Sequence, residues 1–208
     1  MFSEPKDRGL LVVLSAPSGC GKDTVLQKLS EQTRIRRSVS MTTRPQRPGE
    51  TDGKDYYFVD EAYFRRQIEC GNMLEYTNYN GNFYGTPRTA VDEWLRQGET
   101  VVLKIEVEGG ENIRRIYPDS VSIFLVPPSL HVLRERLMRR SSDSLEEIES
   151  RLTIATSEMK QAPQYDYVVV NDRLEDAVCD VRAILCAERC KTTRNEKMIR
   201  EVIQNDEP

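Results

Sequence analysis

One short segment near the amino terminus has the composition of a phosphate-binding loop. An apolar run at residues 10–15 leads into Ala-Pro-Ser-Gly-Cys-Gly-Lys-Asp-Thr at residues 16–24, and a helical pattern follows. Glycines let successive backbone N–H groups turn toward one anion, and a helix amino terminus adds partial positive charge. Lys22 would supply a point charge for the β- and γ-phosphates of a nucleotide. This strand–loop–helix context is the one that a P-loop requires.

The loop departs from the P-loop consensus at two positions. Ala16 stands where the first glycine is usual, and Asp23 stands where a serine or threonine normally helps to hold Mg²⁺. An anion at residue 23 would face phosphate and repel it, so the presence of Asp23 needs an explanation, and two stay open. Either the carboxylate points away and leaves Thr24 or water to serve the metal, or it stabilises the amino terminus of the helix. A glycine-rich turn that binds no nucleotide is the alternative to a phosphate site.

Further segments carry a more specific pattern. They are Ser-Val-Ser-Met-Thr-Thr-Arg-Pro-Gln-Arg-Pro-Gly-Glu at residues 38–50, Gly-Lys-Asp-Tyr-Tyr-Phe at 53–58, Leu-Glu-Tyr at 74–76 and Gly-Asn-Phe-Tyr-Gly-Thr at 81–86. Together with the loop, they resemble the GMP-binding region of guanylate kinases in order and spacing. The resemblance continues through residues 126–129 and 169–172, so it covers roughly residues 9–190.

The resemblance implies an enzyme that transfers the γ-phosphoryl group of ATP to GMP, and with it dGMP, giving GDP in purine nucleotide metabolism. It implies Mg²⁺ as the cofactor and ATP and GMP as the substrates. The GMP phosphate oxygen would attack directly, so no protein nucleophile is needed. The residues expected to bind ATP are Ala16, Pro17, Ser18, Gly19, Cys20, Gly21, Lys22, Asp23, Thr24 and Asn171.

The same resemblance implies a pocket for the GMP phosphate. Arg44 and Arg47 would bind this phosphate, and Tyr56 and Tyr84 would donate their hydroxyls to it. A dianionic phosphate favours forked donors that are always charged, which arginine supplies. Taken singly, the arginines also fit solvated surface charges and the tyrosines fit packing residues. Their joint occurrence at the spacing of the family favours the pocket.

A second group of residues would recognise the base. Glu75 would accept hydrogen bonds from the N1–H and N2 amino groups of guanine, and Ser40 and Thr86 would bond to the guanine edge. Adenine lacks this pair of adjacent donors and would leave a buried carboxylate unpaired, at a cost of about 1–3 kcal/mol or more. Considered alone, a glutamate in a strand is more often exposed.

Glu106 matches an acidic residue that helps the family to order the substrate ribose or the water shell of Mg²⁺. It lies toward the carboxyl end of an apolar strand, which is where open α/β sheets bind ligands. Thr24 and Glu106 are therefore the expected metal contacts, the latter through water. Lys104 replaces a residue that is often acidic in the family, which puts a carboxylate–nucleotide contact there in doubt. Glu108 replaces a glutamine.

Several arginines match the lid of the family and its hinge. Arginines that close over the transferring phosphoryl group are chemically apt, because its charge is spread over three equatorial oxygens. The expected catalytic set is Lys22, Arg44, Arg136, Arg140 and Arg151. Ser141 stands where the family usually has a glycine, so the flexibility of the lid is open. Asn171 would contact the adenine end of ATP, although Asn-Asp after a strand is also an ordinary turn.

Two rival functions remain at this point. The same fold could act on another acceptor, such as a phosphorylated ribose, but such an acceptor would not need Glu75, Ser40 and Thr86. Some guanylate-kinase-like domains instead bind phosphorylated peptides and have lost ATP chemistry. Lys22 and the lid arginines argue against a binding module, whereas Ala16 and Asp23 leave this alternative open.

Apolar runs that alternate with helical patterns must position these residues. Strands are predicted at residues 10–15, 99–107, 120–126 and 165–170, and each is followed by a helical pattern, the first at 23–32. This rhythm is typical of a parallel sheet that helices cover on both faces. The predicted fold class is therefore α/β, with the three-layer core of P-loop NTPases in a single domain over residues 1–208.

Residues 40–87 break this rhythm. They contain short polar strands, many tyrosines, Pro-Gly, Asp-Gly and Asn-Gly turn signals, and a helical pattern at 60–69. They predict a small antiparallel insertion that binds GMP. The core would then take residues of about 8–39, 88–130 and 149–190.

A second break, at about residues 131–148, has the features of a helical lid. A polar connection at 139–144 joins two helical patterns, and Ser144 and Glu147 have capping-box spacing at the start of the second. An ordinary helix hairpin fits this periodicity equally well. The segment 191–208 is polar and predicts a frayed helical tail.

The composition sets wider limits. Hydrophobic residues make up 38% and charged residues 31% of the 208 residues, which is a soluble globular balance. The net charge of −4 argues against nucleic acid as a partner, so local arginine and lysine clusters must hold any anion. No run approaches the ~20 apolar residues of a membrane span, so no membrane partner is expected. The sequence leaves a homo-oligomer open.

The cysteines favour a reducing cytoplasm. Their number is odd, at five, and no C-x-x-C pair occurs, so a secreted disulfide framework is disfavoured. Cys179, Cys186 and Cys190 have the spacing of one helix face, which predicts that they pack in the core. His131 is the single histidine, so a zinc site or a Ser-His-Asp triad has little to be built from.

Overall fold

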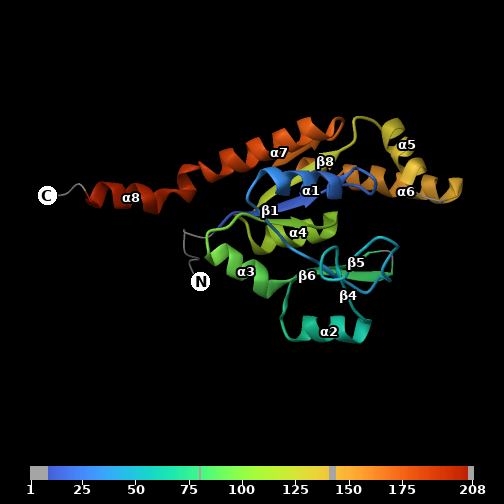
Figure 1. The fold of residues 1–208 in the computed structure, drawn as a ribbon, viewed down its shortest axis with the longest axis horizontal. Coiled ribbons are helices and arrows are strands. Elements are labelled where there is room, and N and C mark those ends of the chain that lie inside the picture. The colour runs from blue at the N-terminus through green and yellow to red at the C-terminus, as the bar shows by residue number, and fades with distance from the viewer. Residues whose placement is uncertain (1–8, 80, 141–143, 206–208) are drawn as a thin grey trace.

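A parallel sheet of five strands forms the centre of the protein. The computed structural model describes residues 9–79, 81–140 and 144–205 (Figure 1). The strand order is β2-β7-β1-β8-β9. The strands are β1 (Leu11–Ser15), β2 (Arg36–Arg37), β7 (Val101–Lys104), β8 (Val121–Val126) and β9 (Tyr167–Val170). The α/β class with a P-loop sheet core, predicted from the rhythm of apolar runs, is confirmed.

Helices cover both faces of this sheet, which explains why its strands are apolar throughout. On one face, Val12 and Leu14 of β1 pack with α1 (Lys22–Gln32) and α7 (Leu174–Arg189). On the other face, Leu11 and Val13 pack with α3 (Arg88–Arg96) and α4 (Val107–Ile116). The alternation along β1 thus divides the core into two apolar layers.

The strand predicted at residues 99–107 is shorter than expected. β7 ends at Lys104, and α4 already begins at Val107, with Glu106 as its N-cap. The alternation of Ile105 and Val107 imitates a strand, but these residues flank the turn at which the chain leaves the sheet. Glu106 therefore lies at a strand-to-helix turn rather than within a strand.

A second sheet of four strands, in the order β4-β3-β6-β5, coincides with the predicted insertion. Its elements are β3 (Met41–Thr42), β4 (Tyr57–Phe58), α2 (Glu61–Glu69), β5 (Met73–Tyr79) and β6 (Asn82–Pro87). The expectation of antiparallel pairing holds for β3–β6 and β5–β6, but β3 and β4 pair in parallel. A small core of Met41, Phe64 and Met73 joins α2 to this sheet.

Two helices lie beside the phosphate-loop end of the main sheet (Figure 1). They are α5 (Leu130–Arg140) and α6 (Leu145–Met159), and an ion pair between Arg134 and Glu149 joins them. The predicted capping box is present, since Ser144 Oγ accepts from the Glu147 N–H and the Glu147 carboxylate accepts from the Ser144 N–H. Ser141 and the rest of residues 141–143 lie outside the described residues.

The cysteines of α7 do not pack in the core, so the prediction made from their spacing was wrong. Cys179, Cys186 and Cys190 are exposed, because α7 buries the neighbouring stripe of Ala177, Val181 and Leu185 instead. Short 3₁₀ turns occur at η1 (Ala162–Gln164) and η2 (Thr192–Arg194).

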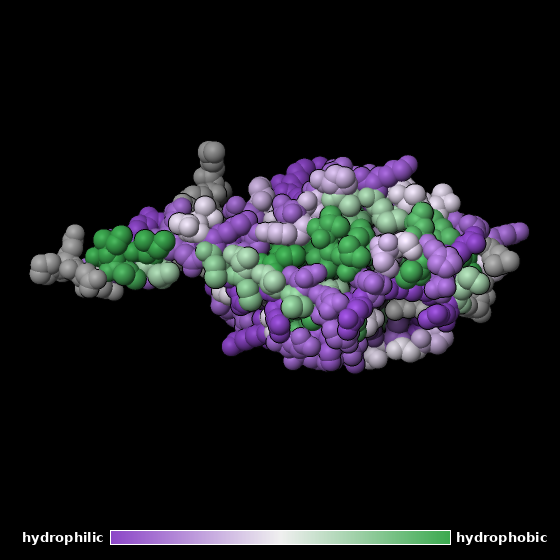
Figure 2. Space-filling view, turned by 90° about the horizontal axis from the view of Figure 1, so that it is seen from above, coloured by the Kyte–Doolittle hydropathy of each residue, from purple (hydrophilic) through white to green (hydrophobic). Residues whose placement is uncertain are grey.

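After η2, α8 (Glu196–Asn205) extends from the body of the protein (Figures 1 and 2). It is amphipathic rather than uniformly polar, and its exposed apolar side chains are those of Met198, Ile199, Val202 and Ile203. Within the described residues, no helix has both the length and the apolar character to cross a membrane.

Glu188 ties α7 to the edge strand β9. The Tyr167 hydroxyl donates to Glu188 Oε1 at 2.5 Å, and Lys191 Nζ lies 2.7 Å from the same oxygen. The Glu188 carboxylate is 1% exposed, so its partners must satisfy it within the protein.

Glu188→Ala should therefore lower the free energy of unfolding by about 2 kcal/mol, because it removes a buried carboxylate that accepts from the partly buried Tyr167 phenol and pairs with Lys191. Denaturant titration would measure the loss, with Glu201→Ala on the exposed face of α8 as the control. Equal stabilities of the two variants would contradict this role of Glu188.

Candidate active site

The phosphate loop, the second sheet and α6 meet around one cavity of about 760 Å³. The residues that line it from the phosphate loop and its surroundings are Ala16, Pro17, Ser18, Gly19, Gly21, Lys22, Asp23, Lys104 and Glu106. Those from the second sheet and its loops are Arg44, Arg47, Glu50, Asp55, Tyr56, Tyr79 and Tyr84, and those from α6 are Glu147, Ser150, Arg151 and Ile154. Most of the residues predicted for the two substrates therefore share one space.

The loop between β1 and α1 has the backbone that a phosphate site needs. Gly19 and Gly21 take φ values of 87° and 84°, which glycine adopts without steric cost. A Cβ at Gly19 would lie 2.8 Å from a methyl carbon of Leu137. Lys22 follows as the first residue of α1, so the loop ends at a helix amino terminus.

Asn171 supports this loop from behind. Its side-chain amide donates to the carbonyl of Cys20 at 2.7 Å, and the residue is buried. The Cys20 thiol is itself fully buried, and this burial raises its pKa to about 12. Neither residue is among those that line the cavity, and the hydrogen bond between them holds the loop in shape.

Lys22 lies at the centre of the cavity floor. Its ammonium donates to the Ile105 carbonyl and to Glu106 Oε1, both at 3.2 Å. Glu106 reaches this position because it caps α4 directly after the neighbouring strand. The predicted phosphate lysine and the predicted acidic residue are thus an ion pair.

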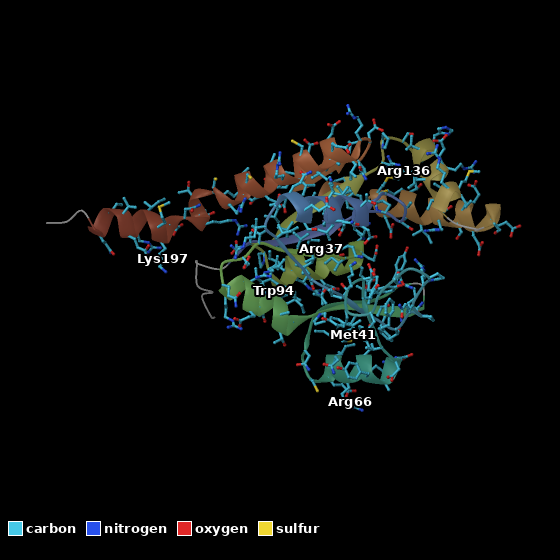
Figure 3. All side chains as sticks on the ribbon, viewed as in Figure 1. Arg37, Met41, Arg66, Trp94, Arg136 and Lys197 are labelled. Carbon is cyan, nitrogen blue, oxygen red and sulfur yellow. The ribbon has the colours of Figure 1, made fainter. Side chains whose placement is uncertain are left out.

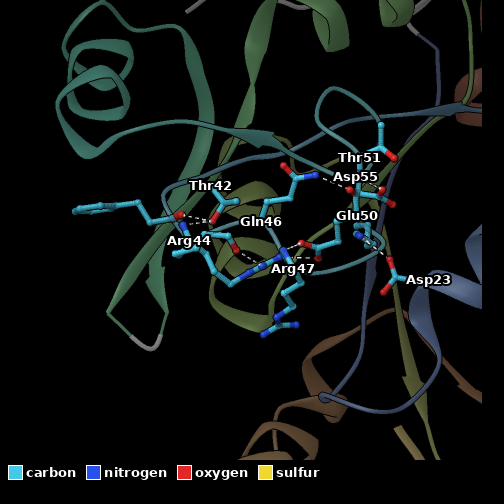
Figure 4. Close-up of polar contacts among 11 residues, drawn as sticks. Asp23, Thr42, Arg44, Gln46, Arg47, Glu50, Thr51 and Asp55 are labelled. Carbon is cyan, nitrogen blue, oxygen red and sulfur yellow. Dashed lines mark hydrogen bonds and ion pairs between the residues drawn. The ribbon is translucent and has the colours of Figure 1, made fainter. Parts of the chain in front are cut away.

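The predicted GMP phosphate pocket lies opposite, on the second sheet. Arg44 donates to Glu50 Oε1 at 2.7 Å (Figure 4). Its guanidinium also lies over the Tyr56 ring, 5.5 Å from the ring centre. Glu50 Oε2 also accepts from the backbone N–H of Arg47 at 2.8 Å. Tyr84 lies edge-on to Tyr56, with ring centres 6.0 Å apart.

Sequence reasoning missed Glu50 as a member of this pocket. The residue was visible within the segment 38–50, but a carboxylate beside a phosphate site gives no obvious signal. In the structure it pre-positions the Arg44 guanidinium, and a bound phosphate would have to replace it. Tyr79, which also lines the cavity, was missed for a similar reason.

Two of the three predicted base-reading residues, Ser40 and Glu75, line a smaller cavity, whereas Thr86 does not line it and reaches the site only through Glu75. Gly85 and Gly109 also line this cavity. The Thr86 hydroxyl donates to Glu75 Oε1 at 2.7 Å. A Cβ at Gly109 would lie 2.6 Å from Glu75 Oε2, so a glycine is needed for α4 to pass the carboxylate.

The Glu75 carboxylate is only 6% exposed. Burial raises its pKa to about 7, the hydrogen bonds from Thr86 oppose this rise, and the charges of Glu106 and Glu108 add to it. An acceptor that is both buried and under-solvated favours a ligand that brings two adjacent N–H donors.

The lid arginines occupy different places. Arg151 on α6 lines the cavity and donates to Ser18 Oγ of the phosphate loop at 2.9 Å. Arg136 on α5 donates to the carbonyls of Asn171 and Asp172 at 2.8 and 3.2 Å, outside the cavity lining (Figure 3). The Arg140 side chain lies outside the described residues.

A half-buried glutamate on α6, outside the cavity lining, also has a perturbed pKa. Burial raises the pKa of Glu158 to about 7, the charge of Glu106 adds to the rise, and Lys22 and the Ser18 backbone oppose it. Its position one turn after Ala155 gave the sequence no functional signal, since it reads as part of an amphipathic helix.

Of the predicted metal contacts, Glu106 lines the cavity, whereas Thr24 is exposed on α1 and does not. The described residues contain no cluster of three or more histidine, cysteine or acidic side chains that would enclose an ion. This donor set fits a magnesium ion bound with nucleotide, because Mg²⁺ keeps several waters and uses one or two carboxylates together with substrate phosphates.

The fold and the cavity are those of a P-loop phosphotransferase. Comparison with known proteins identifies the family. Residues 8–188 match the family model described as guanylate kinase. The chain is 49% identical over 199 residues to a guanylate kinase of Thermus thermophilus, covering 96% of this chain and 90% of the relative.

Further relatives agree with this match. A guanylate kinase of Lactococcus lactis is 50% identical over 190 residues, covering 91% of this chain and 93% of the relative. The crystal structure of a guanylate kinase from Anaplasma phagocytophilum has a TM-score of 0.78 and 39% identity, covering 90% of this chain and 89% of that one. The chain belongs to the guanylate kinase family.

Glu75→Gln should stabilise the empty protein at high pH. Because the pKa of folded Glu75 lies above the unfolded value near 4.3, wild type loses stability as the pH rises from about 4 to 7. At pH 8 the variant should be more stable by up to about 3 kcal/mol, and at pH 4 the difference should vanish.

Denaturant titrations across this pH range would measure the difference. Glu69→Gln, at an exposed site on α2, is the matched control and should show no such trend. A stability difference for Glu75→Gln that does not change between pH 4 and pH 8 would contradict the assignment.

Proposed function

We propose that the two pockets of the cavity bind ATP and GMP and that the chain phosphorylates GMP, and with it dGMP, to GDP. ATP-dependent phosphorylation of GMP is the activity of the guanylate kinase family, to which this chain belongs. The observation that carries the assignment is the shared cavity, which both Lys22 and Arg44 line.

On the donor side, the loop amides and Lys22 would bind the β- and γ-phosphates of ATP. Arg151 reaches the same loop through Ser18, so its guanidinium is close enough to shift onto the transferring group. Placing cations where charge is spread over the equatorial oxygens stabilises the transition state.

On the acceptor side, Arg44, Arg47, Tyr56 and Tyr84 would bind the GMP phosphate. An oxygen of this phosphate attacks the γ-phosphorus of ATP, and the bond from that phosphorus to the β–γ bridging oxygen breaks. ADP leaves, and GDP forms without a protein nucleophile. Glu75, with Ser40 and Thr86, would accept and orient the guanine so that this attack is in line.

The reaction of the family generally uses a divalent metal with ATP. We infer that this ion is Mg²⁺, that Glu106 holds it through water, and that it neutralises charge on the transferring phosphates. Lys22 would then exchange its contact with Glu106 for a contact with phosphate.

We infer that two parts of the chain move during the reaction. They are the GMP-binding insertion at about residues 40–87 and the lid at about 131–148, which would close over the core and exclude water from ATP. Crystal structures with and without GMP that superpose throughout would contradict this motion.

The free cysteines of the chain fit a reducing compartment, and we assign the enzyme to the cytoplasm.

Acceptor selectivity tests the proposed substrate. In an ADP-release assay, kcat/KM should fall from GMP to IMP, which lacks the 2-amino group, and should fall by at least about 10²-fold for AMP. Glu75→Gln should erase most of this ranking, while Glu69→Gln keeps it. A preference for AMP or for a phosphorylated sugar would refute the assignment.

The phosphate lysine tests whether the chain is a kinase or a binding module. Lys22→Ala should weaken binding of an ATP analogue and reduce kcat by about 10²-fold or more, because a charge aimed at the phosphates is lost. Calorimetry and steady-state kinetics would measure both effects. Lys28→Ala, on an exposed turn of the same helix, is the control. An ATP affinity that ignores the Lys22 change would favour the module.

A further inference from the structure

The carboxylate at residue 23 has a dedicated cationic partner. Lys104 Nζ lies 2.5 Å from Asp23 Oδ1, and both side chains line the large cavity. In Figure 4 the dashed line that ends on Asp23 marks this contact. The two residues are 81 positions apart in the chain, so the contact depends on the fold rather than on local sequence.

The parallel pairing of β1 and β7 brings Lys104 to this place. Leu14 and Lys104 are neighbours in the register, and β1 leads into the phosphate loop that ends at Asp23. The Lys104 side chain is 12% exposed, whereas that of Asp23 is 70% exposed. The lysine therefore lies against the floor of the cavity, and the carboxylate comes to it from the first turn of α1.

A third residue fixes the position of this lysine. Its ammonium lies 4.8 Å from the centre of the Tyr56 ring, in the geometry of a cation–π contact. Tyr56 also stacks on Arg44 of the opposite pocket. Lys104 therefore touches one residue of the donor side and one of the acceptor side.

The pairing has an electrostatic consequence for the donor site. Asp23 directly follows Lys22, so an unpaired carboxylate there would repel the phosphates that the loop binds. The ammonium of Lys104, 2.5 Å from Asp23 Oδ1, supplies the positive charge that compensates this carboxylate.

We propose that Lys104 is a positioning residue that neutralises Asp23 and draws it to the cavity floor, so that the loop accepts a nucleoside triphosphate despite an acid at this position. This role rests on the proposed function of the loop as the ATP site. It couples two departures noted in the sequence: the acid at residue 23, where a P-loop usually has serine or threonine, and the base at residue 104, where the family often has an acid.

Four proteins test the coupling: wild type, Lys104→Met, Asp23→Asn and the double variant. Calorimetry would measure binding of a non-hydrolysable ATP analogue with Mg²⁺. Lys104→Met alone should weaken binding at least tenfold, because it leaves Asp23 uncompensated. Asp23→Asn alone should tighten binding, and the double variant should recover most of the affinity lost in Lys104→Met.

Thermal melting without nucleotide separates this role from a merely structural one. A structural ion pair would lower the melting temperature in both single variants and leave ATP affinity unchanged, which would overturn the proposal. The proposal would also be overturned by a double variant that binds as weakly as Lys104→Met, or by an Asp23→Asn variant that binds more weakly than wild type. The comparison of Asp23→Asn with wild type tests the proposal even if the Lys104 variants fail to fold.

The outcome for the coupling is distinct from that for the function as a whole. Wild type that binds the ATP analogue and phosphorylates GMP, with no coupling between residues 23 and 104, would refute only the pairing. Wild type that does neither would refute the proposed function itself.

Discussion

The pairing of β1 with β7 is the constraint on which the site depends. Parallel strands end at the same edge of a sheet, and the register that sets Leu14 beside Lys104 brings the phosphate loop next to the turn after β7. Ile105 and Glu106 in that turn are the partners of Lys22. A slip of this register by one residue would separate Lys22 from Glu106 and would also move the side chains of β7 from one apolar layer of the core to the other.

Charge in the cavity is held in pairs before any phosphate arrives. Lys22 forms an ion pair with Glu106, Arg44 with Glu50, and Lys104 with Asp23. Such pairs keep long cationic side chains ordered and limit the repulsion among them, but each carboxylate competes with a phosphate for its cation. The base pocket is different. Glu75 accepts from the hydroxyl of Thr86 and forms no ion pair within the described part of the chain, so no cation offsets the cost of its burial. Binding of guanine would relieve that cost.

The sequence predicted the sheet, its helices and the second sheet because apolar periodicity and turn residues report local structure directly. Through spacing shared with a family, it also predicted most of the residues that line the cavity, but not Glu50 or Tyr79. It did not predict the ion pairs of the cavity. Asp23 pairs with Lys104, and Arg44 with Glu50, only because the folded chain brings them together. The prediction that the cysteines of α7 pack in the core was wrong for a related reason. Their spacing fits one helix face, but a rotation of the helix decides which face is buried.

The central claim is that both anion pockets open on one space and are filled at the same time. An adenosine and a guanosine joined by five phosphates would span them. Calorimetry should find one such molecule per chain, bound far more tightly than ATP or GMP alone and displaced only when both nucleotides are present. Binding no tighter than that of ATP, and unaffected by GMP, would contradict the account.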